Sequence, residues 1–333
     1  KFPKNKNMFF SFTFVAFIAL IFAILLQFDL YNIGTIISYV ALLGASQFTA
    51  HISAMAILPN LVSNEQTQSA FGLIAFAYFL TSTLAPLFTG NLIDKFGSAI
   101  PTFTKSILLI IAAFISHSIK DPNYQKPAIS NTLKESIQIG FSLIKQNPNV
   151  LNLFVLHWLF NSLAVPGIHG LIPVFSEEKL GMGASGVGIL FAAIGVGGMI
   201  STIGLFIYGN QLQNRMRIVL TCGLLTGLSM ILFALINLKI VNILLLVFFN
   251  FNLITILTLR LGLFAQHIPK DQLGRIFAIN FLTSATSIIG STIIGIIAKN
   301  YGAEIATTIS GSVILVVLIF MSFFARSFRE NIT

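Results

Sequence analysis

Residues 217–239 read RIVLTCGLLTGLSMILFALINLK, with a charged side chain at each end and none between them. About 20 uncharged residues are the length that an α-helix needs to cross roughly 30 Å of hydrocarbon. Eight further intervals of this kind run from Lys6 to Asp29, Asp29 to Glu65, Glu65 to Asp94, Lys145 to Glu177, Lys179 to Arg215, Lys239 to Arg260, Arg275 to Lys299 and Glu304 to Arg326. The spacing of the charges predicts an all-α protein that crosses a membrane many times.

Composition supports lipid as the solvent and excludes several classes of function. Hydrophobic residues make up 56% of the chain and charged residues 9%, against about 25% charged residues in ordinary soluble domains. Cys222 is the one cysteine, which excludes an internal disulfide framework and a cysteine-based metal cluster. The net charge of +9 is spread over short loops rather than one face. We therefore expect no nucleic-acid partner.

Ten membrane spans are predicted, and a polar segment divides them into two groups. The spans cover residues 8–28, 32–57, 69–93, 99–118, 149–173, 185–209, 217–237, 240–263, 275–297 and 302–325. We interpret 1–118 as a partial N-terminal half with four spans, and 149–333 as a C-terminal half with six. The central loop 119–148 contains apolar residues at helical spacing around Leu133 and Ile137, which predicts an amphipathic helix flat on the inner membrane surface.

Lysine and arginine in short loops predict the orientation, because cytoplasmic loops carry an excess of both. With residue 1 inside, thirteen fall on the cytoplasmic side: Lys1, Lys4, Lys6, Lys120, Lys126, Lys134, Lys145, Arg215, Arg217, Lys270, Arg275, Arg326 and Arg329. Five fall on the other side: Lys95, Lys105, Lys179, Lys239 and Lys299. Acidic residues divide evenly, so this bias places both termini in the cytoplasm.

Several local motifs carry a family resemblance. The third span presents small residues and a proline in the order Gly72, Thr81, Ala85, Pro86, Thr89 and Gly90. Small residues let a neighbouring helix approach closely, and a proline removes one backbone hydrogen bond and bends its helix. Further motifs are AILPNLV at 56–62, GMGASGVGIL at 181–190 and PKDQLGR at 269–275, where Arg275 is placed to anchor the start of the following span.

These motifs resemble the major facilitator superfamily, in the branch of the enterobactin exporter and the macrolide efflux pumps. The resemblance implies twelve spans, of which the first two would precede residue 1. It implies a monomer in the inner (plasma) membrane that exports an amphipathic small molecule, drug-like or siderophore, by alternating access coupled to protons. It implies no cofactor. Small-residue stripes in two spans would border the central cavity or the interface between halves: Ala193, Gly197 and Ser201, and Thr283, Ser287, Ser291 and Gly295.

Few residues inside the spans can carry charge or protons. Arg260 is the one charged residue well inside a predicted span, and either it faces a cavity or it extends to the inner interface. The sequence places every carboxylate at the ends of spans or between them. Within this sequence His51 and His157 remain as candidate protonatable groups, with a packing role as the alternative for each. A carboxylate in the two spans expected before residue 1 is the other alternative. Candidate substrate contacts are Gln47, Tyr78, Asn161 and Asn250.

Two other functions remain open at this stage. One is a lipid or lysophospholipid flippase of similar architecture, and the other is a truncated membrane protein that transports nothing. We predict no enzyme, since the chain lacks the phosphate-binding loop, the serine elbow and the zinc-binding His-Glu-x-x-His pattern. We also predict no metal site.

Overall fold

The structure of the chain is a computed structural model, and it describes residues 4–62, 67–119, 141–142, 144–209, 211–268, 279–280, 283 and 286–324. Within these ranges the only regular secondary structure is helical. The predicted amphipathic helix of the central loop lies almost wholly outside the described residues, as does Arg275. By contacts the chain divides into two compact units, Lys1–Tyr78 with Phe88–Ala128, and Phe79–Leu87 with Ile129–Thr333. We call them unit 1 and unit 2.

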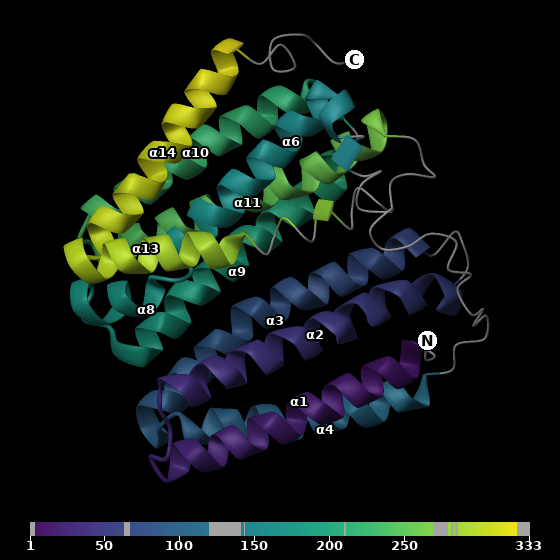
Figure 1. The fold of residues 1–333 in the computed structure, drawn as a ribbon, viewed down its shortest axis with the longest axis vertical. Coiled ribbons are helices and arrows are strands. Elements are labelled where there is room, and N and C mark those ends of the chain that lie inside the picture. The colour runs from purple at the N-terminus through teal and green to yellow at the C-terminus, as the bar shows by residue number, and fades with distance from the viewer. Residues whose placement is uncertain are drawn as a thin grey trace. The chain divides into compact units, whose positions relative to one another are not determined.

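The first four predicted spans are four helices (Figure 1). They are α1 (Lys4–Gln27), α2 (Ile33–Leu61), α3 (Thr67–Phe96) and α4 (Ala99–Ser118). Side-chain hydrogen bonds explain where α2 begins, and a glycine with positive φ explains where α3 ends. At the start of α2, the Asn32 side chain accepts from the Thr35 amide at 3.0 Å while the Thr35 hydroxyl accepts from the Asn32 amide at 2.8 Å. This reciprocal pair satisfies two amides that the first helical turn leaves unbonded. Gly97 follows α3 with φ +76°, which favours glycine.

In unit 1, α1 packs against both α2 and α4. Small residues on α1 form its buried face, among them Ala16 and Ala19, so that the neighbouring helices approach closely. Ser106 on α4 donates to the Ala16 carbonyl at 2.8 Å. Lys105 lies half-buried beside Tyr39 of α2, with its ammonium 3.4 Å from the Tyr39 hydroxyl.

The helices of the C-terminal part follow the predicted spans, with one interrupted helix. The interrupted helix comprises α6 (Pro148–Leu159), the π-helix η1 (Phe160–Ala164), α7 (Val165–Ile168), α8 (Ile172–Val174) and a second π-helix η2 (Phe175–Lys179). The remaining helices are α9 (Gly183–Tyr208), α10 (Arg215–Leu235), α11 (Lys239–His267), α13 (Ser287–Tyr301) and α14 (Ala303–Phe324). The prediction ended the fifth span at residue 173, and the structure extends it to Lys179.

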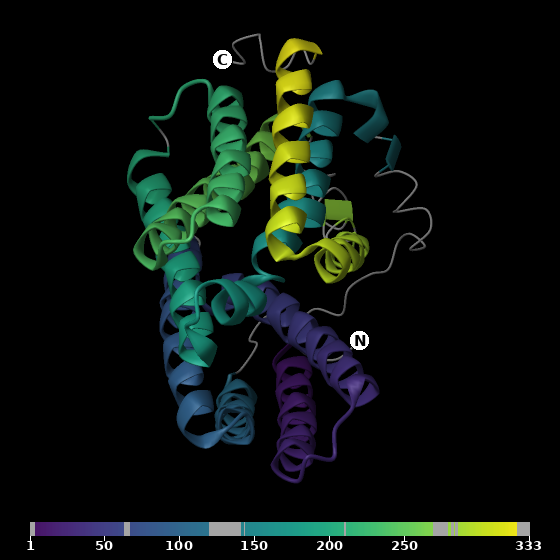
Figure 2. The same ribbon diagram turned by 90° about the vertical axis from the view of Figure 1, so that its left-hand side faces the viewer.

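Glycines allow two close helix crossings in unit 2. A Cβ on Gly197 of α9 would lie 2.2 Å from the Val247 carbonyl oxygen of α11. A Cβ on Gly311 of α14 would lie 2.7 Å from the Gly227 carbonyl oxygen of α10, and these two helices run side by side in Figure 1. At Gly302 the chain turns from α13 into α14, and Figure 2 shows α13 nearly end-on at the foot of α14.

Nine helices in the described ranges are long and apolar enough to span a membrane. They correspond to nine of the ten predicted spans. The remaining span, predicted at 275–297, falls partly outside the described residues; 279–280, 283 and 286 are described, and α13 begins at Ser287. The protein is therefore an all-α, multi-pass membrane protein, as the charge spacing predicted.

Candidate functional site

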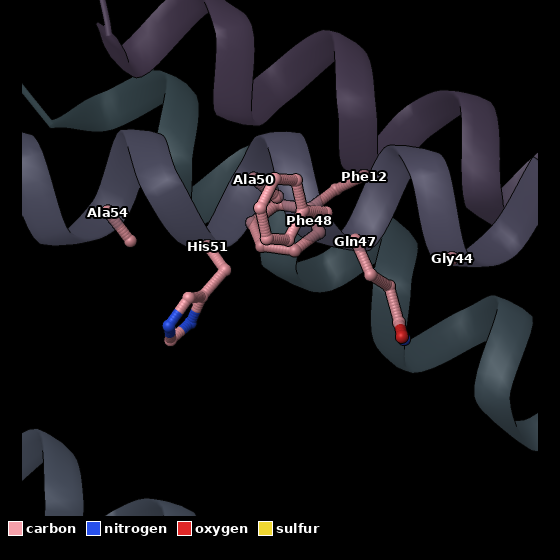
Figure 3. A pocket seen from close by; sticks show the side chains of 7 residues that line it. All are labelled: Phe12, Gly44, Gln47, Phe48, Ala50, His51 and Ala54. Carbon is pink, nitrogen blue, oxygen red and sulfur yellow. The ribbon is translucent and has the colours of Figure 1, made fainter. Parts of the chain in front are cut away.

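One face of α2 carries exposed polar side chains that line a wide-open cavity of unit 1. Gly44, Gln47, His51 and Ala54 recur at intervals of three and four residues, so they share one side of the helix. The cavity has a volume of about 510 Å³. Its lining residues are Phe12, Gly44, Gln47, Phe48, Ala50, His51 and Ala54. In Figure 3 the Gln47 amide and the His51 imidazole extend to the same side of α2.

The lining of this cavity is amphipathic. Gln47 supplies an amide with donors and an acceptor, and His51 supplies an imidazole. Phenylalanine, alanine and glycine form the rest of the lining. The volume lies within the roughly 300–1,000 Å³ of small-molecule sites, which are mostly apolar with a few placed polar groups. An organic molecule with an apolar body and one or two polar groups would match this lining.

A second cluster of polar side chains lies inside unit 2, around Arg260 of α11. Arg260 is only 2% exposed, and its Nη1 donates to Oδ1 of Asn280 at 2.6 Å. The guanidinium carbon lies 5.2 Å from the centre of the Phe264 ring, within the range of a cation–π contact. Arg260 therefore turns into the helix bundle, and the interpretation that it extends to the interface is wrong.

His157 of α6 joins the same cluster through both ring nitrogens. Nε2 lies 3.1 Å from the backbone carbonyl oxygen of Asn280, and Nδ1 lies 2.9 Å from Nδ2 of Asn161. A carbonyl oxygen can only accept, so Nε2 carries the hydrogen and Nδ1 accepts from the Asn161 amide. The imidazole in this arrangement is neutral. We call Arg260, Asn280, His157 and Asn161 the Arg260 cluster.

Asn161 owes its position to the π-helix η1. It is the second residue of that segment, and its Nδ2 also donates to the His157 carbonyl at 2.9 Å. A π-helical turn leaves carbonyl groups of the preceding α-helix without their usual partners, and such turns are frequent at functional sites. The amide of Asn161 thus holds the imidazole and the backbone of His157 together.

These neighbours use only part of the hydrogen-bonding capacity of the Arg260 guanidinium and supply no negative charge. Its Nε is fully buried and has no hydrogen-bond partner in the described part of the chain. Its one hydrogen bond there is to the neutral amide oxygen of Asn280, and the carboxylates of the sequence lie at the ends of spans or between them. A buried charge without a counter-ion is costly, and in membranes such groups usually have a functional role.

Comparison with known proteins identifies the family. The model of the Major Facilitator Superfamily matches residues 2–286. The chain belongs to the major facilitator superfamily. No curated protein sequence matches the chain.

Solved structures of major facilitator proteins share its fold. A POT family transporter in complex with 5-aminolevulinic acid is 14% identical, with a TM-score of 0.73 over 96% of this chain and 82% of that one. The E. coli fucose:proton symporter FucP is 14% identical, with a TM-score of 0.59 over 95% and 83%. The human organic anion transporter MFSD10 is 13% identical, with a TM-score of 0.65 over 96% and 77%. At such identities the likeness concerns the fold, so the protein is a helical bundle of the major facilitator type.

The other predicted site residues of this major facilitator protein neither line the cavity of unit 1 nor belong to the Arg260 cluster. Tyr78 is exposed on α3. Asn250, expected to contact substrate, is buried between α11 and α9, where its amide donates to the Ile194 carbonyl at 2.7 Å. Gly197 lies at the same helix crossing. The remaining motif residues follow in chain order along two helices: Gly72, Ala85, Pro86 and Gly90 on α3, and Ser287, Ser291 and Gly295 on α13.

Sequence reasoning missed Asn280, which joins the Arg260 cluster through two groups. Its side chain accepts from Arg260, and its backbone carbonyl accepts from His157. A carboxylate is the usual partner of a buried arginine, and the sequence places none inside a span. A polar amide near the start of an apolar span was the available signal.

Proposed function

We propose that this major facilitator protein is a secondary active transporter that exports an amphipathic small molecule by alternating access. The observation that carries the proposal is the cavity of unit 1, in which Gln47 and His51 are the polar groups of an otherwise apolar lining. Its substrate would place a hydrogen-bonding group against α2 and an apolar body against Phe12 and Phe48. Drug-like compounds and siderophores are the expected classes.

The proposed direction of transport rests on the sequence motifs. They resemble the branch of the enterobactin exporter and the macrolide efflux pumps, whose members export. The proposed location is the inner (plasma) membrane with the C-terminus in the cytoplasm, as the bias of lysine and arginine predicts. The solved structures with this fold have names that refer to peptides, a sugar and organic anions, which supports a small organic solute.

Protons are the proposed coupling ion. The described spans hold no carboxylate in their interiors, and the titratable groups that support the proposal within them are histidines. His51 lines the cavity and His157 lies in the Arg260 cluster. Histidine changes its charge near physiological pH and is suited to carry a proton in exchange for substrate.

Transport by the full chain in proteoliposomes tests the proposal. The probes are ethidium, a macrolide and a catecholate siderophore, each measured with and without a pH gradient. We expect accumulation of at least one probe that depends on the gradient. Gln47→Ala and His51→Ala should each raise the half-saturating concentration about three- to tenfold, because each removes a hydrogen bond worth about 1 kcal/mol.

Thr49→Ala is the matched control. Thr49 lies on the same helix, but its hydroxyl donates to the Ala45 carbonyl and it does not line the cavity. The proposal fails if no probe moves, or if transport is indifferent to Gln47 and His51. Movement of a fluorescent lysophospholipid without any dependence on the pH gradient would identify a flippase instead.

A further inference from the structure

The hydrogen bonds around His157 are compatible with one protonation state. Nδ1 accepts from Nδ2 of Asn161, and Nε2 donates to the carbonyl of Asn280. A protonated imidazole has a hydrogen on both nitrogens and accepts nothing. Its Nδ1–H would then face the Asn161 amide group, donor against donor, at 2.9 Å. Protonation must therefore break this contact.

Rotation of the Asn161 side-chain amide does not resolve the conflict. The same Nδ2 donates to the backbone carbonyl of His157 at 2.9 Å. A rotated amide would place Oδ1 against that carbonyl oxygen, acceptor against acceptor. The π-helix η1, which carries Asn161, fixes both contacts at once.

Repulsion by the positive charge of Arg260 also favours the neutral form of His157. Arg260 of α11 is the charged group that faces His157 among the described residues, and both bind Asn280. The neighbouring groups from η1 and from residues 279–280 are amides, which bring no negative charge. A protonated His157 would thus meet a guanidinium in a region from which water is excluded, where repulsion between like charges is strong.

We propose that His157 is the proton-binding group of the transporter, and that the Arg260 cluster is a lock which closes only when His157 is neutral. The proposal rests on the proposed function for its role in transport. The lock joins α6, α11 and residues 279–280, since Asn280 binds both His157 and Arg260. Proton binding opens the lock and loosens these three segments, which couples protonation to a change of conformation within unit 2.

The first test measures proton binding without transport. The thermal stability of the full chain, purified in detergent, is followed between about pH 8 and pH 5, the range in which histidine titrates. The locked form requires neutral His157, so wild-type stability should fall as the pH falls. His157→Gln should lose more than half of this pH dependence. His117→Gln, an exposed histidine in the last turn of α4, should keep it. Equal pH dependence in wild type and His157→Gln overturns the proposal.

The second test measures coupling in proteoliposomes with ethidium. His157→Gln cannot take up the proton that opens the lock, so its accumulation of ethidium under a pH gradient should fall to the level reached without one. Accumulation that still follows the gradient in His157→Gln overturns the proposal, although the exporter itself would stand. The wild-type protein could transport no probe and still give the expected result in the stability test. The proposal for the Arg260 cluster would then be retained, and the proposed export function would be rejected.

Two neighbours distinguish a lock from simple packing. Asn161→Leu removes the donor to Nδ1, and Arg260→Gln removes the facing charge, so both favour protonated His157. Each should move the midpoint of the pH profile upward by roughly half to one unit. A structural role alone would lower the transport rate and leave the midpoint in place. An unchanged midpoint in both variants overturns the proposal.

Discussion

The carbonyl oxygen of Ser162 lies where a side chain on Gly290 would begin. A Cβ on Gly290 of α13 would be 1.9 Å from this oxygen and 2.7 Å from the Ser162 Cα. The contact sits in the π-helix η1, directly after Asn161. The Ser162 hydroxyl reaches Thr286, just before α13, at 3.3 Å. The helix that carries His157 is therefore held against α13 at a point with room for glycine alone.

Gly290→Ala should destabilise the protein by about 1–3 kcal/mol, because the obstacle is backbone and cannot rotate away. The measurement is thermal unfolding in detergent. Gly295→Ala on the same helix is the control, since nothing lies within 4 Å of its Cβ position. This variant should be neutral or more stable by up to roughly 1 kcal/mol, as alanine favours the helix. Equal effects at both positions would contradict the packing described.

Lys179 holds the end of α10. Its ammonium donates to the carbonyls of Phe233 and Ala234 in the last turn of that helix, and it lies 3.6 Å from Glu304 in the first turn of α14. A cation at a helix C-terminus satisfies carbonyls that have no partner within the helix. The Lys179 side chain is 7% exposed, whereas that of Glu304 is 57% exposed.

Lys179→Ala should therefore lower the free energy of unfolding by about 1–3 kcal/mol, as expected for hydrogen bonds to a charged group. Glu304→Gln should lower it by less than about 1 kcal/mol, since an exposed ion pair contributes little. Thermal unfolding at low and high salt provides the comparison, and salt should affect only the Glu304 contribution. A larger loss for Glu304→Gln would assign the stability to the ion pair.

The positions of the spans could be predicted because charge is excluded from hydrocarbon. Lys239 and Asp29 mark span ends in the sequence, and helices begin or end within a few residues of both. The interrupted helix from Pro148 to Lys179 was predicted as a shorter, regular one. Its π-helix η1 packs against α13, and the hydroxyl of Thr307 on α14 donates to the Gly167 carbonyl of α7 at 2.8 Å. Such contacts join residues far apart in the sequence and leave no local pattern.

The candidate sites were predictable only in part. The interval of four residues between Gln47 and His51 places both on one helix face, so the sequence held the signal for the cavity. The partner of Arg260 could not be found in the same way. Asn280 lies outside α11 and 20 residues after Arg260, so the contact between them depends on tertiary packing rather than on helical spacing. Arg260, His157 and Asn161 were named separately, and the structure brings them together.

Ser201 of α9 and Thr255 of α11 form a hydrogen bond between helices, 2.8 Å long. Thr255 already donates to the Phe251 carbonyl, so Ser201 must be the donor. A double-mutant cycle with Ser201→Ala and Thr255→Val should give a coupling energy of about 0.5–1.5 kcal/mol, the range for such bonds between membrane helices. Ser201→Ala with Thr226→Val is the control cycle, since Thr226 on α10 bonds within its own helix. Coupling of similar size in both cycles would contradict a direct bond.

The predicted orientation can be tested by labelling two loops. Tyr31, between α1 and α2, and Gln213, between α9 and α10, are both exposed. Five predicted spans separate them, so they should lie on opposite sides of the membrane. The bias of lysine and arginine predicts Tyr31 outside and Gln213 inside. In a Cys222→Ser background, which removes the one native cysteine, each position is replaced by cysteine in turn.

A maleimide that cannot cross the membrane should label Tyr31→Cys in intact cells, and Gln213→Cys only after permeabilisation. Labelling of both variants in detergent serves as the control for reactivity. The reverse pattern would place the termini outside, against the charge bias. Labelling of both positions from one side would mean that a predicted span between them does not cross, and the interrupted helix from Pro148 to Lys179 would be the first to examine.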